Sequence, residues 1–182
     1  MKKDMKRYHD RLKNILSSEE LCCIKKDSST LIEIAYDYIE MGEFKKAFRL
    51  FCVGARLNSL DPDVLNGLGV SLCELGKFDI SRQILENAIR LYPDNPVILS
   101  NLASIYRETG LIELAIHCYH RAVTIDPGIV EAHLNLADLY YDTGDLFVAY
   151  LTVLEVLKNH PGNEEAIELR DDLLINLGLS IA

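Results

Sequence analysis

Apolar residues recur at steps of three and four along most of the chain, which is the spacing of amphipathic helices. The pattern repeats without a gap over four 34-residue rows, 28–61, 62–95, 96–129 and 130–163. Repeats of this length form stacked units, since one unit cannot bury its apolar face alone. We therefore predict an all-α protein with four helical repeats in tandem.

Three kinds of aligned position shape each repeat. A column of small residues allows paired helices to approach closely, at Ala35, Gly69, Ala103 and Ala137. A second column is glycine, which can take the left-handed conformation that ends a helix, at Gly42, Gly76, Gly110 and Gly144. Prolines stop the second helix of the last three rows, at Pro93, Pro127 and Pro161. Each row is thus predicted to be a hairpin of two helices.

The segments on either side of the rows are also predicted to be helical. Residues 1–27 are compatible with one or two helices, and Ser17 and Glu20 have the spacing of a capping box. We expect these helices to cover the apolar side of the first repeat and to offer a surface for self-association. Residues 164–182 repeat the first-helix spacing and then stop, which predicts a C-terminal capping helix.

The 34-residue period and its small-residue, glycine, alanine and proline columns resemble the tetratricopeptide repeat (TPR) over residues 28–163. The resemblance implies a right-handed superhelix in which the first helix of each hairpin lines a concave groove. It also implies a non-catalytic scaffold that binds another protein. The terminal helix is similar to the solvating helix with which such arrays end.

Charge narrows the choice of partner. The chain has a net charge of −9, and because residues 1–27 carry +3, the remainder carries −12. Such a body repels nucleic acid and anionic membranes. No run approaches the roughly 18 apolar residues of a membrane span, and the basic start lacks the apolar region of a secretory signal. We expect a soluble, cytoplasmic protein whose five scattered cysteines are reduced thiols.

Two stretches invite a chemical interpretation, and neither supports one. Residues 67–76, GLGVSLCELG, are glycine-rich, but no strand precedes them and the G-K-[ST] of a phosphate loop is absent. Gly69 and Gly76 belong to the repeat columns, so only Gly67 lacks an explanation. His117 and His120 lie on either side of Cys118 and are spaced to share one helix face, but no third zinc ligand is evident. We therefore interpret the two histidines as a surface pair. The sequence offers no set of nucleophile, base and orienting residue at a recognisable spacing. We therefore expect no enzyme activity, metal or cofactor.

Helix phase selects the residues that would face the groove. The predicted peptide-binding residues are Ile32, Glu33, Tyr36, Asn66, Val70, Asn101, Ser104, Arg107, Asn135, Asp138 and Tyr141. Arg107 is the single base among the groove-facing positions, which carry many acids. The Lys and Arg clamp with which some TPR cochaperones hold a C-terminal carboxylate is therefore missing. We expect the partner to be a neutral or basic extended segment with apolar anchors.

Three functions remain open at this point. Asn101 and Asn135 occupy the same slot of successive rows, which resembles the asparagine ladder in the TPR arm of O-GlcNAc transferases. The other two rows have Glu33 and Gly67 there, so the ladder is half present. A scaffold or adaptor that binds an extended peptide is the first prediction. The alternatives are a dedicated chaperone resembling the class II chaperones of type III secretion translocators, and a regulatory TPR arm.

Overall fold

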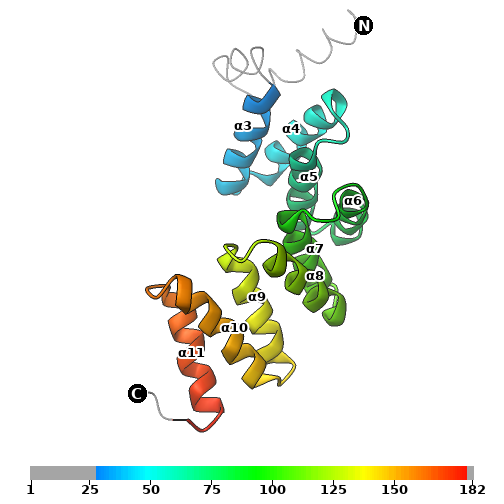
Figure 1. Ribbon diagram of the computed structural model, residues 1–182. Helices are drawn as coiled ribbons and strands as arrows, with labels where there is room; N and C mark the ends of the chain where they lie inside the picture. The colour runs from blue at the N-terminus through cyan, green and yellow to red at the C-terminus, as the bar shows by residue number, and fades with distance from the viewer. Residues whose placement is uncertain (1–27, 180–182) are drawn as a thin grey trace, which may run out of the picture. The chain divides into compact units, whose positions relative to one another are not determined.

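The computed structural model describes residues 28–179, and every regular element in that range is an α-helix. This confirms the predicted all-α helical-repeat fold. The predicted N-terminal helices of residues 1–27 lie outside the described residues. In chain order the helices are α3 (Ser28–Glu40), α4 (Phe44–Leu57), α5 (Pro62–Glu74), α6 (Phe78–Leu91), α7 (Pro96–Glu108), α8 (Ile112–Ile125), α9 (Val130–Asp142), α10 (Leu146–Asn159) and α11 (Glu164–Asn176) (Figure 1).

The helix starts keep the period of the sequence. The first helices α3, α5, α7 and α9 begin at residues 28, 62, 96 and 130, which are the first residues of the four rows. The second helices α4, α6, α8 and α10 follow at the same offset each time, at residues 44, 78, 112 and 146. Helix α11 begins at residue 164, one full period after the start of α9 at residue 130, so it occupies the place of a further first helix.

Every first helix ends in the same backbone turn. Gly42, Gly76, Gly110 and Gly144 all have positive φ, between 70° and 87°, as their column predicts. At the first turn the Gly42 N–H donates to the Ile39 carbonyl at 2.9 Å and the Glu43 N–H donates to the Tyr38 carbonyl at 2.8 Å. These two bonds define a Schellman motif, which satisfies carbonyls that the helix end leaves open. Gly178 closes α11 in the same way, with φ of 70°.

Side-chain caps begin three of the first helices, and they too follow the period. Asp61 accepts hydrogen bonds from the N–H groups of Asp63 and Val64 at the start of α5. Asn95 accepts one such bond, from the Ile98 N–H at 3.0 Å in α7, and Asn163 accepts one from the Ala166 N–H at 2.8 Å in α11. Short polar side chains at this position satisfy N–H groups that have no partner within the helix. These caps therefore fix the residue at which the first helix of each of these units begins.

The chain forms two compact units, and the boundary falls after Ala88, near the end of α6. In the first unit, α3 packs on α4 and α4 packs on α5. Their shared core includes Ala47, Leu50, Phe51 and Val64. In the second unit, α7 pairs with α8, α9 with α10, and α11 packs on α10. The core at its C-terminal end consists of Leu134, Ala137, Ala149, Val153, Val156, Ala166 and Leu173.

The small-residue column is a set of close helix contacts. Ala35, Ala103 and Ala137 are fully buried. At Gly69 an added Cβ would lie 2.5 Å from Cδ2 of Leu85 in α6, which is closer than a carbon contact allows. The Gly69 carbonyl also accepts a 2.5 Å hydrogen bond from Oγ of Ser81, so α5 and α6 touch through backbone at this point. Gly69 is thus required by the hairpin and not by a bound phosphate.

Gly67, which the repeat pattern left unexplained, has a separate structural reason. A Cβ at this position would lie 2.1–2.5 Å from three ring atoms of Phe51. The Phe51 ring is fully buried and packs edge-on against Tyr36, with ring centroids 5.1 Å apart. Phe51 belongs to the second helix of the first repeat, whereas Gly67 belongs to the first helix of the next. The glycine therefore makes room for a large side chain between two repeats.

This contact predicts that Gly67→Ala destabilises the protein. The new methyl group must displace the Phe51 ring, and overpacking of this kind costs about 1–3 kcal/mol of unfolding free energy. Gly162→Ala is the matched control, because an added Cβ there meets nothing within 4 Å and the backbone φ is not positive. Urea denaturation of both variants measures the effect. In a Phe51→Leu background, Gly67→Ala should cost less, since the ring that it strikes is gone; equal costs in both backgrounds would contradict this account.

Candidate functional site

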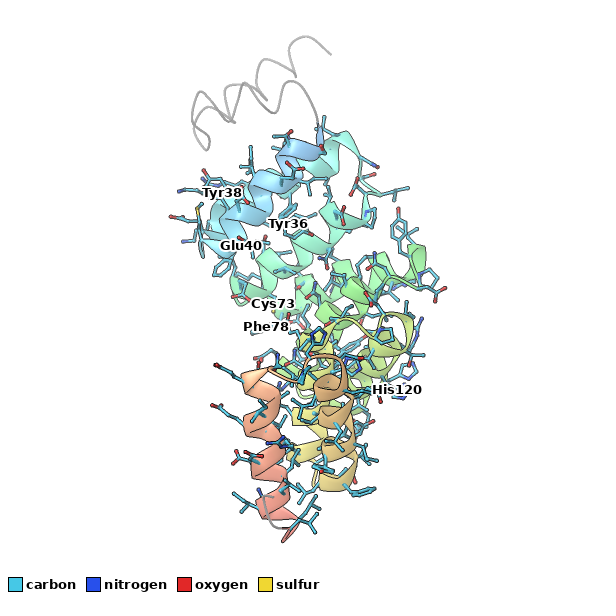
Figure 2. All side chains as sticks on the ribbon, turned by 60° about the vertical axis from the view of Figure 1, so that its left-hand side comes forward. Tyr36, Tyr38, Glu40, Cys73, Phe78 and His120 are labelled. Atoms are coloured by element: carbon cyan, nitrogen blue, oxygen red, sulfur yellow. The ribbon has the colours of Figure 1, made fainter. Side chains whose placement is uncertain are left out.

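The first-helix face of the first unit includes Tyr36 of α3, which is labelled in Figure 2 and forms a hydrogen bond with the start of α5. The Tyr36 hydroxyl donates to the Asp63 carbonyl at 3.0 Å and accepts from Nδ2 of Asn66 at 3.2 Å. Burial raises the pKa of Tyr36, so the hydroxyl keeps its proton and remains a donor. Asn66 is only 5% exposed. These two predicted groove residues therefore bind each other and join α3 to α5.

The other predicted residues of this unit differ in how far they reach solvent. Glu33 is exposed on α3. Ile32 is half-buried and packs against the core that contains Phe51. Val70 is half-buried on α5. Solvent on this face therefore meets a carboxylate beside partly covered apolar side chains.

Arg107 is the centre of the first-helix face in the second unit. Its Nη1 donates to Oδ1 of Asn135 at 3.3 Å and lies 3.9 Å from Oδ2 of Asp138. Its Nη2 lies 3.8 Å from Oδ2 of Asp142. Arg107 comes from α7, and the other three residues come from α9. The structure thus brings together three of the residues predicted from sequence, Arg107, Asn135 and Asp138, from two successive repeats.

This cluster has more negative than positive charge. Burial raises the pKa of Asp138 above its ordinary value; Arg107 opposes the rise, and the charges of Asp142 and Glu165 add to it. Glu165 belongs to α11, so acids from α9 and α11 act on the same carboxyl group. One guanidinium therefore faces three carboxylates, and the surplus attracts a cation.

Helix α11 contributes to the same face. Nδ2 of Asn176 donates to the Tyr141 hydroxyl of α9 at 3.0 Å. The sequence analysis identified Tyr141 but missed Asn176. A signal was present, since Asn176 lies one 34-residue step after Asp142, the residue that follows Tyr141 on α9. Ser104, another predicted residue, makes a 2.7 Å hydrogen bond with the Tyr119 hydroxyl of α8 and so faces its own hairpin partner.

The two asparagines of the predicted ladder lie on adjacent first helices, Asn101 on α7 and Asn135 on α9. Both are half-buried. Oδ1 of Asn135 already accepts one hydrogen bond from Arg107, which leaves this amide its Nδ2 donor and one further lone pair on Oδ1. The binding role of the two amides stays a prediction.

The histidine pair does not converge with other ligands. His117 and His120 are exposed, whereas Cys118 between them is buried, and burial raises the pKa of its thiol. Among residues 28–179 no three His, Cys, Asp or Glu side chains are placed to hold a metal ion. Within the same range no helix combines the length and apolar character needed to cross a membrane.

Comparison with known proteins identifies the fold. Residues 63–92 match the family model described as Tetratricopeptide repeat, and residues 103–144 match one described as TPR repeat. The chain is a tetratricopeptide repeat protein. A search of the curated proteins finds no match. TPR folds bind other proteins or peptides and are typically non-catalytic interaction scaffolds.

Several solved structures share the fold of this TPR protein. TTC0263, a thermophilic TPR protein from Thermus thermophilus, superposes with a TM-score of 0.71 at 18% identity, with 84% of each chain covered. YrrB, described as a TPR protein with an unusual peptide-binding site, gives a TM-score of 0.64 at 18% identity, covering 87% of this chain and 84% of its own. A TPR protein from Parabacteroides merdae ATCC 43184 gives 0.68 at 25% identity, covering 82% of this chain and 60% of its own.

The electrostatics of the Arg107 cluster predict how Asp138 affects stability. Because the folded protein has the higher pKa at Asp138, this group contributes stability that is fully present below the unfolded pKa and is lost as pH rises through the folded pKa. The unfolding free energy of wild type minus that of Asp138→Asn should therefore fall from acidic to neutral pH. Chemical denaturation across that range measures the difference.

Arg107→Gln provides the companion measurement. Arg107 holds the pKa of Asp138 down, so its removal should extend the loss of stability to higher pH when Arg107→Gln is compared with the double variant Arg107→Gln/Asp138→Asn. A difference between wild type and Asp138→Asn that does not change with pH, or that grows as pH rises, would show that burial does not dominate at this carboxyl group.

Proposed function

We propose that this TPR protein is a non-catalytic adaptor that binds an extended segment of another protein along its first-helix face. The observation that supports the proposal is the cluster around Arg107. Side chains of α7 and α9 meet there on one face, and Asn176 of α11 bonds to Tyr141 beside them. A segment lying across these helices would contact successive repeats, and each repeat would add a similar set of contacts.

The charge of this face favours a basic segment. Arg107 is engaged with Asp138 and Asp142, and Glu165 adds a further carboxylate. A Lys or Arg of the partner would gain from the surplus negative charge, whereas an acidic segment would be repelled. Apolar contacts come from Val97, which is 50% exposed at the start of α7, and from the half-buried ring of Tyr141. The partner is accordingly a neutral or basic segment with apolar anchors.

The asparagine pair gives the segment a backbone contact. Asn101 and Asn135 lie one 34-residue step apart, on adjacent first helices. Nδ2 of Asn135 is a donor that a peptide carbonyl can accept from, while its Oδ1 is held by Arg107. This division of roles orients the amide in advance, which lowers the entropic cost of binding.

Selection from a displayed library of random peptides tests the proposal. Peptides selected by wild type should be rich in Lys or Arg with apolar neighbours. For such a peptide, the double variant Asp142→Asn/Glu165→Gln should bind about 2- to 30-fold more weakly, since an exposed ion pair contributes roughly 0.2–1 kcal/mol. Fluorescence anisotropy of the labelled peptide measures the affinities.

The control for this experiment is Glu113→Gln/Asp145→Asn. It changes the net charge by the same amount, but Glu113 lies in the first turn of the second helix α8 and Asp145 precedes the second helix α10. Equal loss of affinity in both double variants would show that only overall charge matters. Selection of acidic peptides, or of none, would contradict the proposed site.

The two alternative functions, a chaperone and a regulatory arm, differ from an adaptor in the kind of ligand that each would bind. A translocator chaperone keeps a long apolar protein soluble on co-expression, whereas an adaptor captures a short linear segment. A regulatory arm acts only when joined to a catalytic domain. The half ladder of Asn101 and Asn135 is the feature that the arm shares with this chain, and it serves the adaptor equally well.

A further inference from the structure

The second unit has a pocket away from the first-helix face. Helices α8, α9 and α10 line an open pocket of about 360 Å³, and none of the predicted groove residues lines it. Its apolar lining comes from Val123 of α8, Leu136 of α9, and Val148 and Leu151 of α10. His120, labelled in Figure 2, lies on α8 and contributes to the lining, as does Glu155 on α10. The pocket is at the lower end of the range of about 300–1,000 Å³ in which proteins bind ligands.

A buried histidine in this pocket has one unused nitrogen. His133 is only 6% exposed, and its Nδ1 lies 3.1 Å from the Ile129 carbonyl. A carbonyl oxygen can only accept, so Nδ1 carries the hydrogen and donates it. In the neutral ring the other nitrogen, Nε2, is then an acceptor. Within residues 28–179, Nε2 of His133 has no hydrogen-bond partner. Nε2 is not sealed from solvent, so a ligand in the pocket that has a donor can form a hydrogen bond with it.

The surface beside the pocket is apolar and exposed. Val148 and Leu151, which line the pocket, are 42% and 49% exposed, and Phe147 next to them on α10 is 62% exposed. Phe147 and Leu151 are four residues apart, so they lie on one side of the helix. An exposed apolar area of this kind is typical of a surface that contacts another protein. It extends beyond the pocket, which favours a protein partner over a free small molecule.

We propose that this pocket binds the indole side chain of a tryptophan on a partner protein. Indole combines a large apolar ring with one N–H donor and no acceptor, which matches the apolar walls of the pocket and the Nε2 acceptor of His133. Phenylalanine lacks the donor, and the hydroxyl of tyrosine adds acceptor lone pairs for which His133 offers no donor. The chain contains no tryptophan, so the indole is supplied from outside it. This site is separate from the first-helix face and does not depend on the peptide binding proposed there.

The absence of tryptophan from the chain also makes the test direct. N-acetyl-tryptophanamide is the probe, and when it is excited at the red edge of indole absorption, only the probe emits. Titration with the full chain, at a pH where imidazole is neutral, should shift the probe emission to shorter wavelength with a dissociation constant in the millimolar range. The 1-methylindole analogue lacks the N–H and should bind several-fold more weakly, by the strength of one neutral hydrogen bond.

Three variants make the result specific. Leu151→Arg should abolish the emission shift, because it places a charged side chain in the pocket wall. Leu114→Arg is its control, since Leu114 on α8 is similarly exposed, at 46%, and does not line the pocket. In His133→Phe, checked for folding by circular dichroism, the probe and its methyl analogue should bind equally. The proposal is wrong if the probe shows no shift at millimolar protein, if Leu114→Arg removes binding as Leu151→Arg does, or if His133→Phe keeps the preference for the N–H.

Discussion

The structure depends on the left-handed glycine that closes each first helix. Because the same Schellman turn follows every first helix, the second helix of each hairpin begins two residues after the glycine, at Phe44, Phe78, Ile112 and Leu146. This fixed step places the small-residue column against its neighbours, as Gly69 shows with Leu85 and Ser81. Any other residue would strain the turn, since φ near 70° puts its Cβ against the backbone. The helix pairing, and with it the first-helix face, follows from this one backbone conformation.

The fold was predictable from sequence because its determinants recur. A glycine, a small residue or a proline that returns with a 34-residue period can be found without knowing which side chains touch. Periodicity also indicated the side of each helix that faces away from the hairpin core, and three residues selected in this way, Arg107, Asn135 and Asp138, contact one another. Gly178, which follows α11, continues the glycine column beyond the fourth row.

Features that depend on one pair of side chains were not predictable in this way. The ring of Phe51 fills the space over Gly67, and neither residue is the typical one of its column. Asn66 was expected to face a peptide, but its position below the Tyr36 hydroxyl follows from the packing of α3 on α5. The pocket beside His133 arises between α8, α9 and α10, and helix phase says nothing about how far three helices stand apart. Sequence periodicity describes each helix, whereas these features belong to contacts between helices.

Helix α11 has a consequence for protein engineering. It begins with the cap at Asn163, one 34-residue step after Ile129, and it ends with the turn at Gly178, as each earlier first helix does. Its C-terminal glycine is therefore a ready junction, at which a designed second helix starting two residues later would find the backbone already turned toward it. A helical module joined at this glycine would follow the same 34-residue spacing as the repeats before it, without a new linker. The number of helices in such an array can therefore be increased by repeating this one glycine turn.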